Sequence, residues 1–178
     1  MSCPFSWPEI EQKSGVTKEE SELINSAQIF DKVGEKGIRK MSEKFYDLVY
    51  NDNERLSTGV YLRDAFSSTT KAMAIAHQQE FFIQKLGGPN LYSQRTGSRH
   101  TGLIKRHVPY PVTREAADRW LFHMRTALSG LSEWDPISVE TVMKFCMFQA
   151  EVIMAGRELM NPSVYIGYSG MVVETSSE

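Results

Sequence analysis

Residues 142–155 read VMKFCMFQAEVIMA, and in a helix their apolar side chains cover most of the circumference. Asp135-Pro136 places a capping carboxylate and a proline before this stretch, and Asn161-Pro162 follows it, so one helix is expected from there to about Leu159. A surface that is apolar all round has to be covered on every side. We therefore expect this helix to be the most buried element of the protein.

Other segments carry apolar residues at spacings of three and four, which predicts helices with one buried face. They span residues 26–33, 35–50, 67–86 and 113–130, the last two counted with their capping residues. Gly34 separates the first two, Gly87-Gly88-Pro89 ends the third, and Gly130 ends the fourth. The sequence has no run of alternating strand residues and no internal repeat, so the predicted fold class is all-α.

A chain of 178 residues, 41% of them hydrophobic, fits one domain with a complete core. We expect that domain over residues 26–160. Residues 1–25 form an N-terminal extension, and because 1–24 show no sustained helical period, they are expected to lie on the domain or to be partly disordered. The C-terminal tail, 161–178, contains Gly and Ser and is expected to be mobile.

The charge balance and the cysteine content argue against several classes of protein. With 20 Lys and Arg against 22 Asp and Glu, the net charge of −2 argues against a nucleic-acid binder. No stretch approaches the roughly 20 apolar residues of a membrane span, and the first 25 residues do not fit a signal or transit peptide. Cys3 and Cys146 are far apart and fit a reducing compartment, so a cytoplasmic protein is expected.

The segment 87–112 has an unusual composition, with four Gly, three Pro, no acidic residue and a helical period only at 103–107. Its cations are Arg95, Arg99, Lys105 and Arg106, which leaves 16 positive against 22 negative charges in the rest of the chain. Long irregular loops in compact domains are usually functional, and a basic loop on an acidic domain suggests an anionic ligand. A solvated surface loop is the alternative.

Several catalytic and metal-binding patterns are missing from the sequence. It contains no Glu-x-x-His pair, no HExxH zinc motif, no phosphate-binding glycine-rich loop and no Gly-x-Ser-x-Gly elbow. Gln78 interrupts an otherwise apolar helix stripe, and its simplest role is to satisfy a backbone group at a helix crossing. His107, beside Lys105 and Arg106, is either a structural histidine or a haem ligand whose neighbouring cations meet the propionates.

Five short motifs keep the order and spacing of one known family. They are Phe45-Tyr46, Gly87-Gly88-Pro89, Leu91-Tyr92-Ser93-Gln94-Arg95, Arg106-His107-Val108-Pro109-Tyr110-Pro111-Val112 and Arg119-Trp120-Leu121. Together they resemble the group II truncated haemoglobins, the two-on-two globins of bacteria and plants. The resemblance covers roughly residues 30–159, and the N-terminal extension is similar to those of plant and algal members.

This resemblance implies a truncated globin fold, a two-over-two helical sandwich whose B/E and G/H helix pairs enclose haem b. His107 matches the proximal iron ligand, while Tyr46 and Trp120 match the distal tyrosine and the G-helix tryptophan. Gln78 falls on the distal helix, one turn after Ala74. The other matched positions line the haem or contact its propionates; they are Tyr61, Ala74, His77, Phe81, Phe82, Tyr92 and Arg106.

The resemblance also implies a haem protein that binds O2, NO or CO. Tyr46, Gln78 and Trp120 carry O–H or N–H donors suited to stabilising bound O2. Two or three hydrogen bonds of about 1 kcal/mol each would slow O2 release roughly 10- to 100-fold. Slow release suits NO dioxygenation, peroxide or nitrite reduction, or sensing, rather than bulk transport. Such redox chemistry also calls for an unidentified reductase.

The sequence allows two alternative functions. One is a cofactor-free helical module that docks an acidic partner through residues 87–112, and the other is a haem-based gas or redox sensor coupled to a separate output partner. His77, three residues after Ala74, either becomes a sixth iron ligand or meets a propionate or water. A homodimer is compatible with the sequence.

Overall fold

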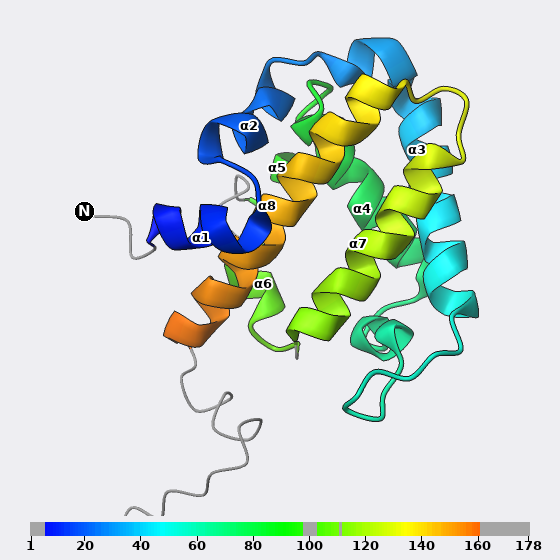
Figure 1. The fold of residues 1–178 in the computed structure, drawn as a ribbon. Coiled ribbons are helices and arrows are strands. Elements are labelled where there is room, and N and C mark those ends of the chain that lie inside the picture. The colour runs from blue at the N-terminus through cyan, green and yellow to red at the C-terminus, as the bar shows by residue number, and fades with distance from the viewer. Residues whose placement is uncertain (1–5, 98–102, 111, 161–178) are drawn as a thin grey trace, which may run out of the picture.

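Helices make up the regular structure of the computed structural model, which describes residues 6–97, 103–110 and 112–160 (Figure 1). The elements are α1 Trp7–Ser14, α2 Lys18–Glu22, the 3-10 helix η1 Leu23–Asn25, α3 Ile29–Asn51, the 3-10 helix η2 Leu62–Phe66, α4 Lys71–Lys85, α5 Leu91–Thr96, α6 Leu103–His107, α7 Arg114–Ser129 and α8 Pro136–Met160. Within those residues the only β-type pairing is an isolated bridge between Arg55 and Tyr61. The all-α prediction is confirmed.

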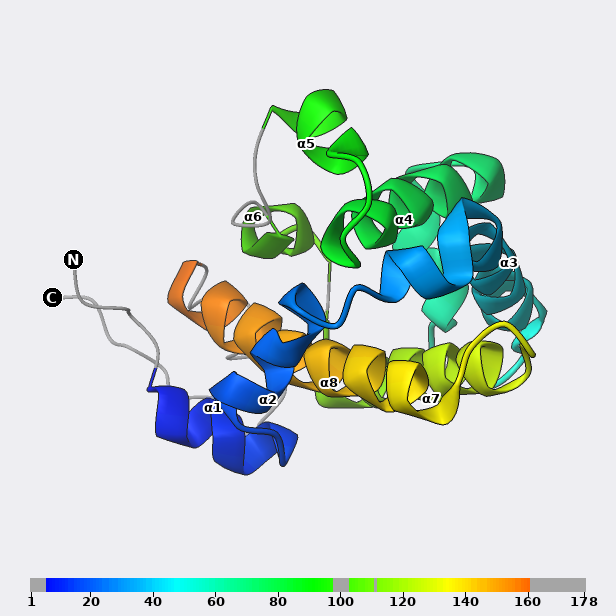
Figure 2. The ribbon, with the colours of Figure 1, turned by 90° about the horizontal axis from the view of Figure 1, so that it is seen from above.

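Two helix pairs form the body of the protein. Helix α3 packs on α4, α7 packs on α8, and α3 also packs on α7, which joins the two pairs. Figure 2 shows α7 and α8 as one layer, with α3 and α4 as the other. The short helices α5 and α6 lie on the α4 side of α8. This arrangement confirms the expected two-over-two sandwich.

The helix ends follow the predicted capping chemistry. The Thr70 hydroxyl accepts a hydrogen bond from the Met73 amide at 3.2 Å at the start of α4, and Thr113 does the same for Ala116 at 3.2 Å at the start of α7. Asp135 accepts from the Ser138 amide at 3.0 Å and so caps α8. These side chains satisfy amides that have no partner within their own helix.

Helix α3 consists of two helical segments that meet at Gly34, where the sequence predicts a break between two helices. Gly34 has φ 63° and ψ 178°, a non-helical conformation with positive φ that favours glycine, and it kinks α3 at this point. The predicted break is confirmed, although the first segment begins at Ile29 and not at residue 26.

The described residues of the N-terminal extension form two short α-helices, although residues 1–24 show no sustained helical period. Its helices α1 and α2 pack on the face of α8 that is turned away from α5 and α6 (Figure 2). Ile10 and Val16 are buried there against Phe148 and Val152. Helices of eight and five residues are too short to show a repeating apolar pattern, which is why the sequence did not predict them.

Helix α8 is buried along most of its length, as its composition predicts. The buried apolar side chains of its central part are Val139, Val142, Met143, Phe145, Cys146, Phe148, Val152, Ile153 and Met154. No helix of the described residues is long and apolar enough to cross a bilayer. The expectation of a mobile tail falls on residues 161–178, which lie outside the described part of the chain.

Candidate functional site

A cluster of aromatic rings joins α3 to α7. Tyr46 and Phe45 are buried on α3, with their ring centroids 5.0 Å apart, and Trp120 of α7 lies 5.0 Å from Phe45. Phe66, at the end of η2, meets the Tyr46 ring edge to face at 5.3 Å. Burial raises the pKa of Tyr46, so its phenol stays protonated and remains a hydrogen-bond donor. The structure thus brings Tyr46 and Trp120 into contact with the same buried ring, that of Phe45.

Polar groups near this cluster lack protein partners. The Gln78 side-chain oxygen is buried without a hydrogen bond, so it does not take up the backbone group that its sequence position suggested. Within the described part of the chain, the Tyr46 hydroxyl and the Trp120 indole N–H also make no hydrogen bond. The buried Gln78 oxygen costs roughly 1–3 kcal/mol and, as an acceptor, calls for a donor. The Tyr46 and Trp120 groups are donors, and they are available to a ligand that accepts a hydrogen bond.

A second aromatic cluster links α4, α5 and α8. Phe81 of α4 lies 5.3 Å from the rings of Phe82 and Tyr92, and 6.2 Å from Phe145 of α8. The Arg106 guanidinium of α6 lies over the Tyr92 ring at 4.7 Å and donates a hydrogen bond to the Tyr92 hydroxyl. A cation and a phenol held together next to apolar rings suit an apolar ligand that carries carboxylates.

His77 borders the same cations. Burial, followed by the positive charges of Arg95 and Arg106, lowers the pKa of His77, while Glu80 acts in the opposite direction. Glu80 also forms an ion pair with Arg95. The structure therefore places His77 near both arginines and near Glu80, and the net effect lowers its pKa. Ala74, one turn before Gln78, is buried in the core with Phe82.

His107 ends helix α6 with its ring fixed by its own helix. The ring Nδ1 lies 2.8 Å from the carbonyl oxygen of Leu103. Since a carbonyl only accepts, Nδ1 carries the proton and Nε2 keeps its lone pair. Burial, the largest influence, lowers the pKa of His107, and Arg157 and Arg106 act in the same direction. The neutral imidazole is thereby in the form that ligates a metal ion.

Tyr61 lies between two guanidinium groups. Those of Arg55 and Arg63 lie 4.9 Å and 4.0 Å from its ring centroid, and its backbone amide donates to the Asp64 carboxylate at 2.8 Å. In the segment between α3 and α4, the ring that contacts Tyr46 is that of Phe66, which the sequence analysis did not identify. Its position depends on how the segment between α3 and α4 folds, and no hydropathy period marks that segment.

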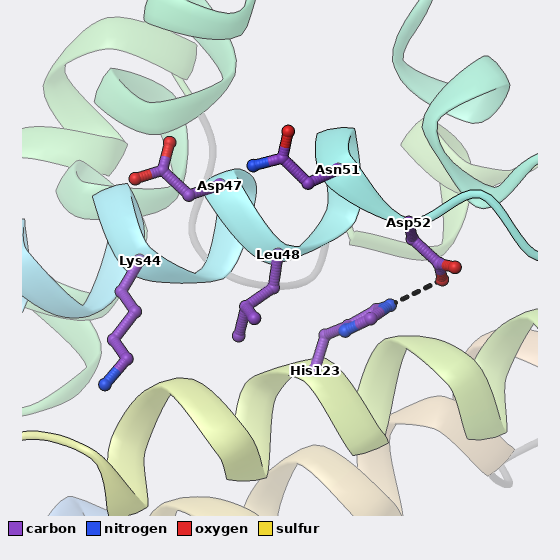
Figure 3. A pocket seen from close by; sticks show the side chains of 6 residues that line it. All are labelled: Lys44, Asp47, Leu48, Asn51, Asp52 and His123. Atoms are coloured by element: carbon purple, nitrogen blue, oxygen red, sulfur yellow. Dashed lines mark hydrogen bonds and ion pairs between the residues drawn. The ribbon is translucent and has the colours of Figure 1, made fainter.

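A partly buried ion pair, which the sequence analysis did not identify, joins α7 to the end of α3. Arg119 donates from Nε and Nη2 to the two Asp52 carboxylate oxygens at 2.6 and 2.7 Å. His123, one turn further along α7, places Nε2 2.7 Å from the same carboxylate (Figure 3). Hydrogen bonds from Arg119 hold the pKa of Asp52 well below its usual range. Because Arg119 directly precedes Trp120, this pair anchors the turn of α7 that carries the indole to the end of α3.

The Asp52–His123 pair also lines an open pocket of about 330 Å³. Its other lining residues are Lys44, Asp47, Leu48 and Asn51 (Figure 3). Lys44 is tied to the Gly130 carbonyl at 3.0 Å, and Asp47 is paired with Lys71. The groups that line this pocket are thus mostly engaged with each other or with neighbouring helices. It is separate from the aromatic clusters that hold the predicted site residues.

The residues of the candidate site fit a planar apolar group that carries a metal ion and carboxylates. His107 offers one neutral nitrogen ligand, Arg106 and Tyr92 offer a carboxylate contact, and the aromatic clusters offer apolar surface. Tyr46 and Gln78 supply unpartnered polar groups for a further small ligand. Among the described residues, no group of three or more His, Cys, Asp or Glu side chains is placed to hold a metal ion.

Comparisons with known proteins agree with this chemistry. The model of the bacterial-like globin family matches residues 28–153. "Two-on-two hemoglobin-3" of Arabidopsis thaliana is 43% identical over 148 residues, which cover 83% of this chain and 81% of the relative. "Group 2 truncated hemoglobin 3-1" of Lotus japonicus is 40% identical over 148 residues, covering 83% and 84%.

A solved structure extends the similarity to three dimensions. The haemoglobin of the thermophilic phototrophic bacterium Chloroflexus aurantiacus superposes with a TM-score of 0.60 at 26% identity. The superposition covers 70% of this chain and 95% of that protein.

Replacing Asp52 by Asn should lower the free energy of unfolding by about 1–2 kcal/mol at pH 7, because it removes the charged acceptor of Arg119 and His123 and leaves Arg119 only the exposed Glu54. The depressed pKa of Asp52 stabilises the fold above its unfolded pKa of about 3.9, and this contribution is lost as the pH falls toward the folded value. The difference between wild type and variant should therefore be constant above about pH 5 and shrink below pH 4. Urea denaturation across this range measures it.

The matched control is Asp47→Asn, which removes an exposed carboxylate paired with Lys71 on the same helix. Surface ion pairs contribute about 0–1 kcal/mol, so this variant should be close to wild type at every pH. Equal losses in the two variants, or a loss in Asp52→Asn that does not depend on pH, would contradict the assignment.

Proposed function

The chain belongs to the bacterial-like globin family and, within it, to the group II truncated haemoglobins, and from this premise we propose that it oxidises nitric oxide to nitrate with bound O2. Its cofactor is haem b, which globins of this family bind together with small gaseous ligands. Bulk oxygen transport is the less suitable role, because the distal donors favour retention of O2 over its release.

His107 holds the cofactor through Nε2, since its Nδ1 proton is engaged by the Leu103 carbonyl. Arg106, supported by Tyr92, is placed to pair with a propionate. Phe81 and Phe82 supply apolar contact and help to exclude water. His77, in the field of Arg95 and Arg106, is assigned to the propionate edge and not to the iron.

One observation carries the proposal, namely that the polar groups of Tyr46, Gln78 and Trp120 have no protein partner. Donors that are already fixed in an apolar site stabilise developing negative charge without having to reorganise. Each such hydrogen bond contributes on the order of 1 kcal/mol, so the set slows loss of O2 by about 10- to 100-fold. O2 that stays bound for longer is more often still bound when NO enters the site.

When bound and reduced, the haem binds O2 and supplies the one electron with which O2 and NO combine to form nitrate. The protein then needs an electron donor, which we propose to be a reductase. Tyr46 remains a neutral donor throughout, because burial raises its pKa. The buried free thiol of Cys146 is compatible with a reducing, cytoplasmic setting.

The alternative of a cofactor-free docking module has weaker support. It requires the cations of residues 87–112 to be available to an acidic partner, yet Arg95 is paired with Glu80. It also gives no role to the donors of Tyr46 and Trp120, which have no partner in the described part of the chain. A haem-based sensor uses the same site and differs in needing an output partner.

Replacing His107 by Gly should abolish stable haem binding, because it removes the one nitrogen ligand that the site offers. Added imidazole should restore the absorption of the bound haem by filling the space left by the ring. The matched control, His77→Ala, should keep full haem occupancy. Full occupancy in His107→Gly without imidazole, or a loss confined to His77→Ala, would refute the ligand assignment.

Replacing Tyr46 by Phe should raise the O2 dissociation rate about 5- to 10-fold, because one hydrogen bond of roughly 1 kcal/mol is lost. Stopped-flow displacement of O2 by CO measures the rate. Tyr50→Phe is the control, since this ring neighbours Tyr46 on the same helix at 6.4 Å. The same rate in both variants would show that Tyr46 is not a donor to the ligand.

The reduced protein, saturated with O2, should consume NO and release nitrate in equal amounts. An NO electrode together with nitrate analysis measures both quantities over a single turnover, and a chemical reductant extends the measurement to several turnovers. Slow or absent NO consumption by protein that binds O2 normally would exclude NO oxidation and favour transport or sensing.

A further inference from the structure

Helix α6 is too short to hold His107 in place by itself. It spans five residues, Leu103–His107, and helices of this length are not stable alone in water. Its internal support includes a bond from the Val108 amide to the Ile104 carbonyl at 3.1 Å. The orientation of the His107 ring must therefore depend on what α6 packs against, and that neighbour is α8.

Arg157 of α8 reaches the end of α6 and the turn that follows it. Its Nε donates to the carbonyl oxygen of His107 at 2.9 Å, and its Nη1 donates to the carbonyl of Val112 at 3.4 Å. The residue is only 5% exposed. A guanidinium spreads its donors in a rigid plane, so one side chain fixes both ends of the segment from His107 to Val112.

Gly156, next to Arg157, lets α6 approach α8 closely. A Cβ atom at this position would lie 2.6 Å from Cγ2 of Ile104, which is less than side chains tolerate. Ile104 therefore packs against the bare backbone of α8, three residues before His107. Any larger residue at position 156 would have to push α6 away from α8.

Helix α8 is itself a fixed reference for α6, because other helices cover its remaining faces. Helix α7 packs along it, and α1 and α2 pack on the face turned away from α6 (Figure 2). The apolar cluster under α1 consists of Ile10, Val16, Phe148 and Val152, and Ile104 of α6 packs against the same cluster. The N-terminal helices thus support α8 where α6 rests on it.

We propose that Arg157 is a positioning residue that clamps α6 onto α8 and so sets the orientation of the His107 ring. The clamp acts through the His107 and Val112 carbonyls, and the close contact of Gly156 with Ile104 makes it possible. The proposal rests on the proposed function in that His107 is the haem ligand. It assigns to α8 a role in haem retention and in the strength of the bond between the imidazole and the iron.

The test compares Arg157→Met with Arg114→Met. Methionine keeps much of the apolar volume of the side chain and removes the donors. Arg114 is a matched control because it also pairs with α8, through the buried Glu151, and with Asp118 of its own helix. Urea denaturation of the two variants shows how far each destabilises the fold. Arg157→Lys serves as a milder variant that keeps the charge without the planar fork.

In the haem-loaded protein, Arg157→Met should lose haem about 10-fold faster than wild type to an excess of a haem-binding acceptor protein. Its ferrous iron–histidine stretching band, measured by resonance Raman spectroscopy, should broaden and move to lower frequency. Arg157→Lys should fall between Arg157→Met and wild type. Arg114→Met should keep the wild-type band whatever its stability. Equal bands in Arg157→Met and wild type would overturn the proposal.

A second measurement does not need haem. In the apoprotein, hydrogen exchange of the Val108 amide should be about 10-fold faster in Arg157→Met than in wild type, because α6 opens more readily. In Arg114→Met it should change only in step with global stability. If wild type takes up no haem, the proposed function fails while this exchange result still decides the clamp. Unchanged exchange in Arg157→Met would refute the clamp whether or not haem binds.

Discussion

The need to cover α8 on every side is the constraint on which the rest of the structure depends. Its apolar residues are buried by α7 along one side, by α1 and α2 on another, and by α6 on the face toward α4. Two of these contacts also place a residue of the candidate site. The contact with α6 carries His107, and the contact with α7 leaves the opposite face of α7 to present Trp120 to Phe45 of α3. The packing of the core around α8 therefore also positions residues of the candidate site.

Polar interactions divide the site into parts that are fixed and parts that are left open. Asp52 takes up the charge of Arg119 and ties α7 to α3, while Arg157 ties α6 to α8. By contrast, the Tyr46 hydroxyl and the Trp120 indole N–H make no hydrogen bond within the described part of the chain. Both groups are donors, so a bound ligand that accepts a hydrogen bond can use them, whereas a partner within the protein would leave no donor for the ligand. Stabilisation of such a ligand therefore depends on this incomplete hydrogen bonding.

The sequence predicted those features that depend on local chemistry. Thr70, Thr113 and Asp135 cap the helices that their positions indicate, and the apolar stretch 142–155 is buried as expected. The sequence did not predict the features that depend on tertiary contacts. Helices α1, α2 and α5 are too short to show a period, and the partners of Asp52 lie more than sixty residues away. Tyr61 was placed by resemblance, but its ring lies between two arginines whose positions no motif reveals.

A titration of the purified apoprotein with haem tests the central claim most directly. The account predicts saturation at one haem per chain, a Soret band typical of histidine ligation, and quenching of tryptophan fluorescence, because Trp120 lies beside the proposed site. The same titration of reduced protein under O2 should give a stable spectrum of the ligand-bound form. Haem uptake that never saturates, with unchanged tryptophan fluorescence, would contradict the account.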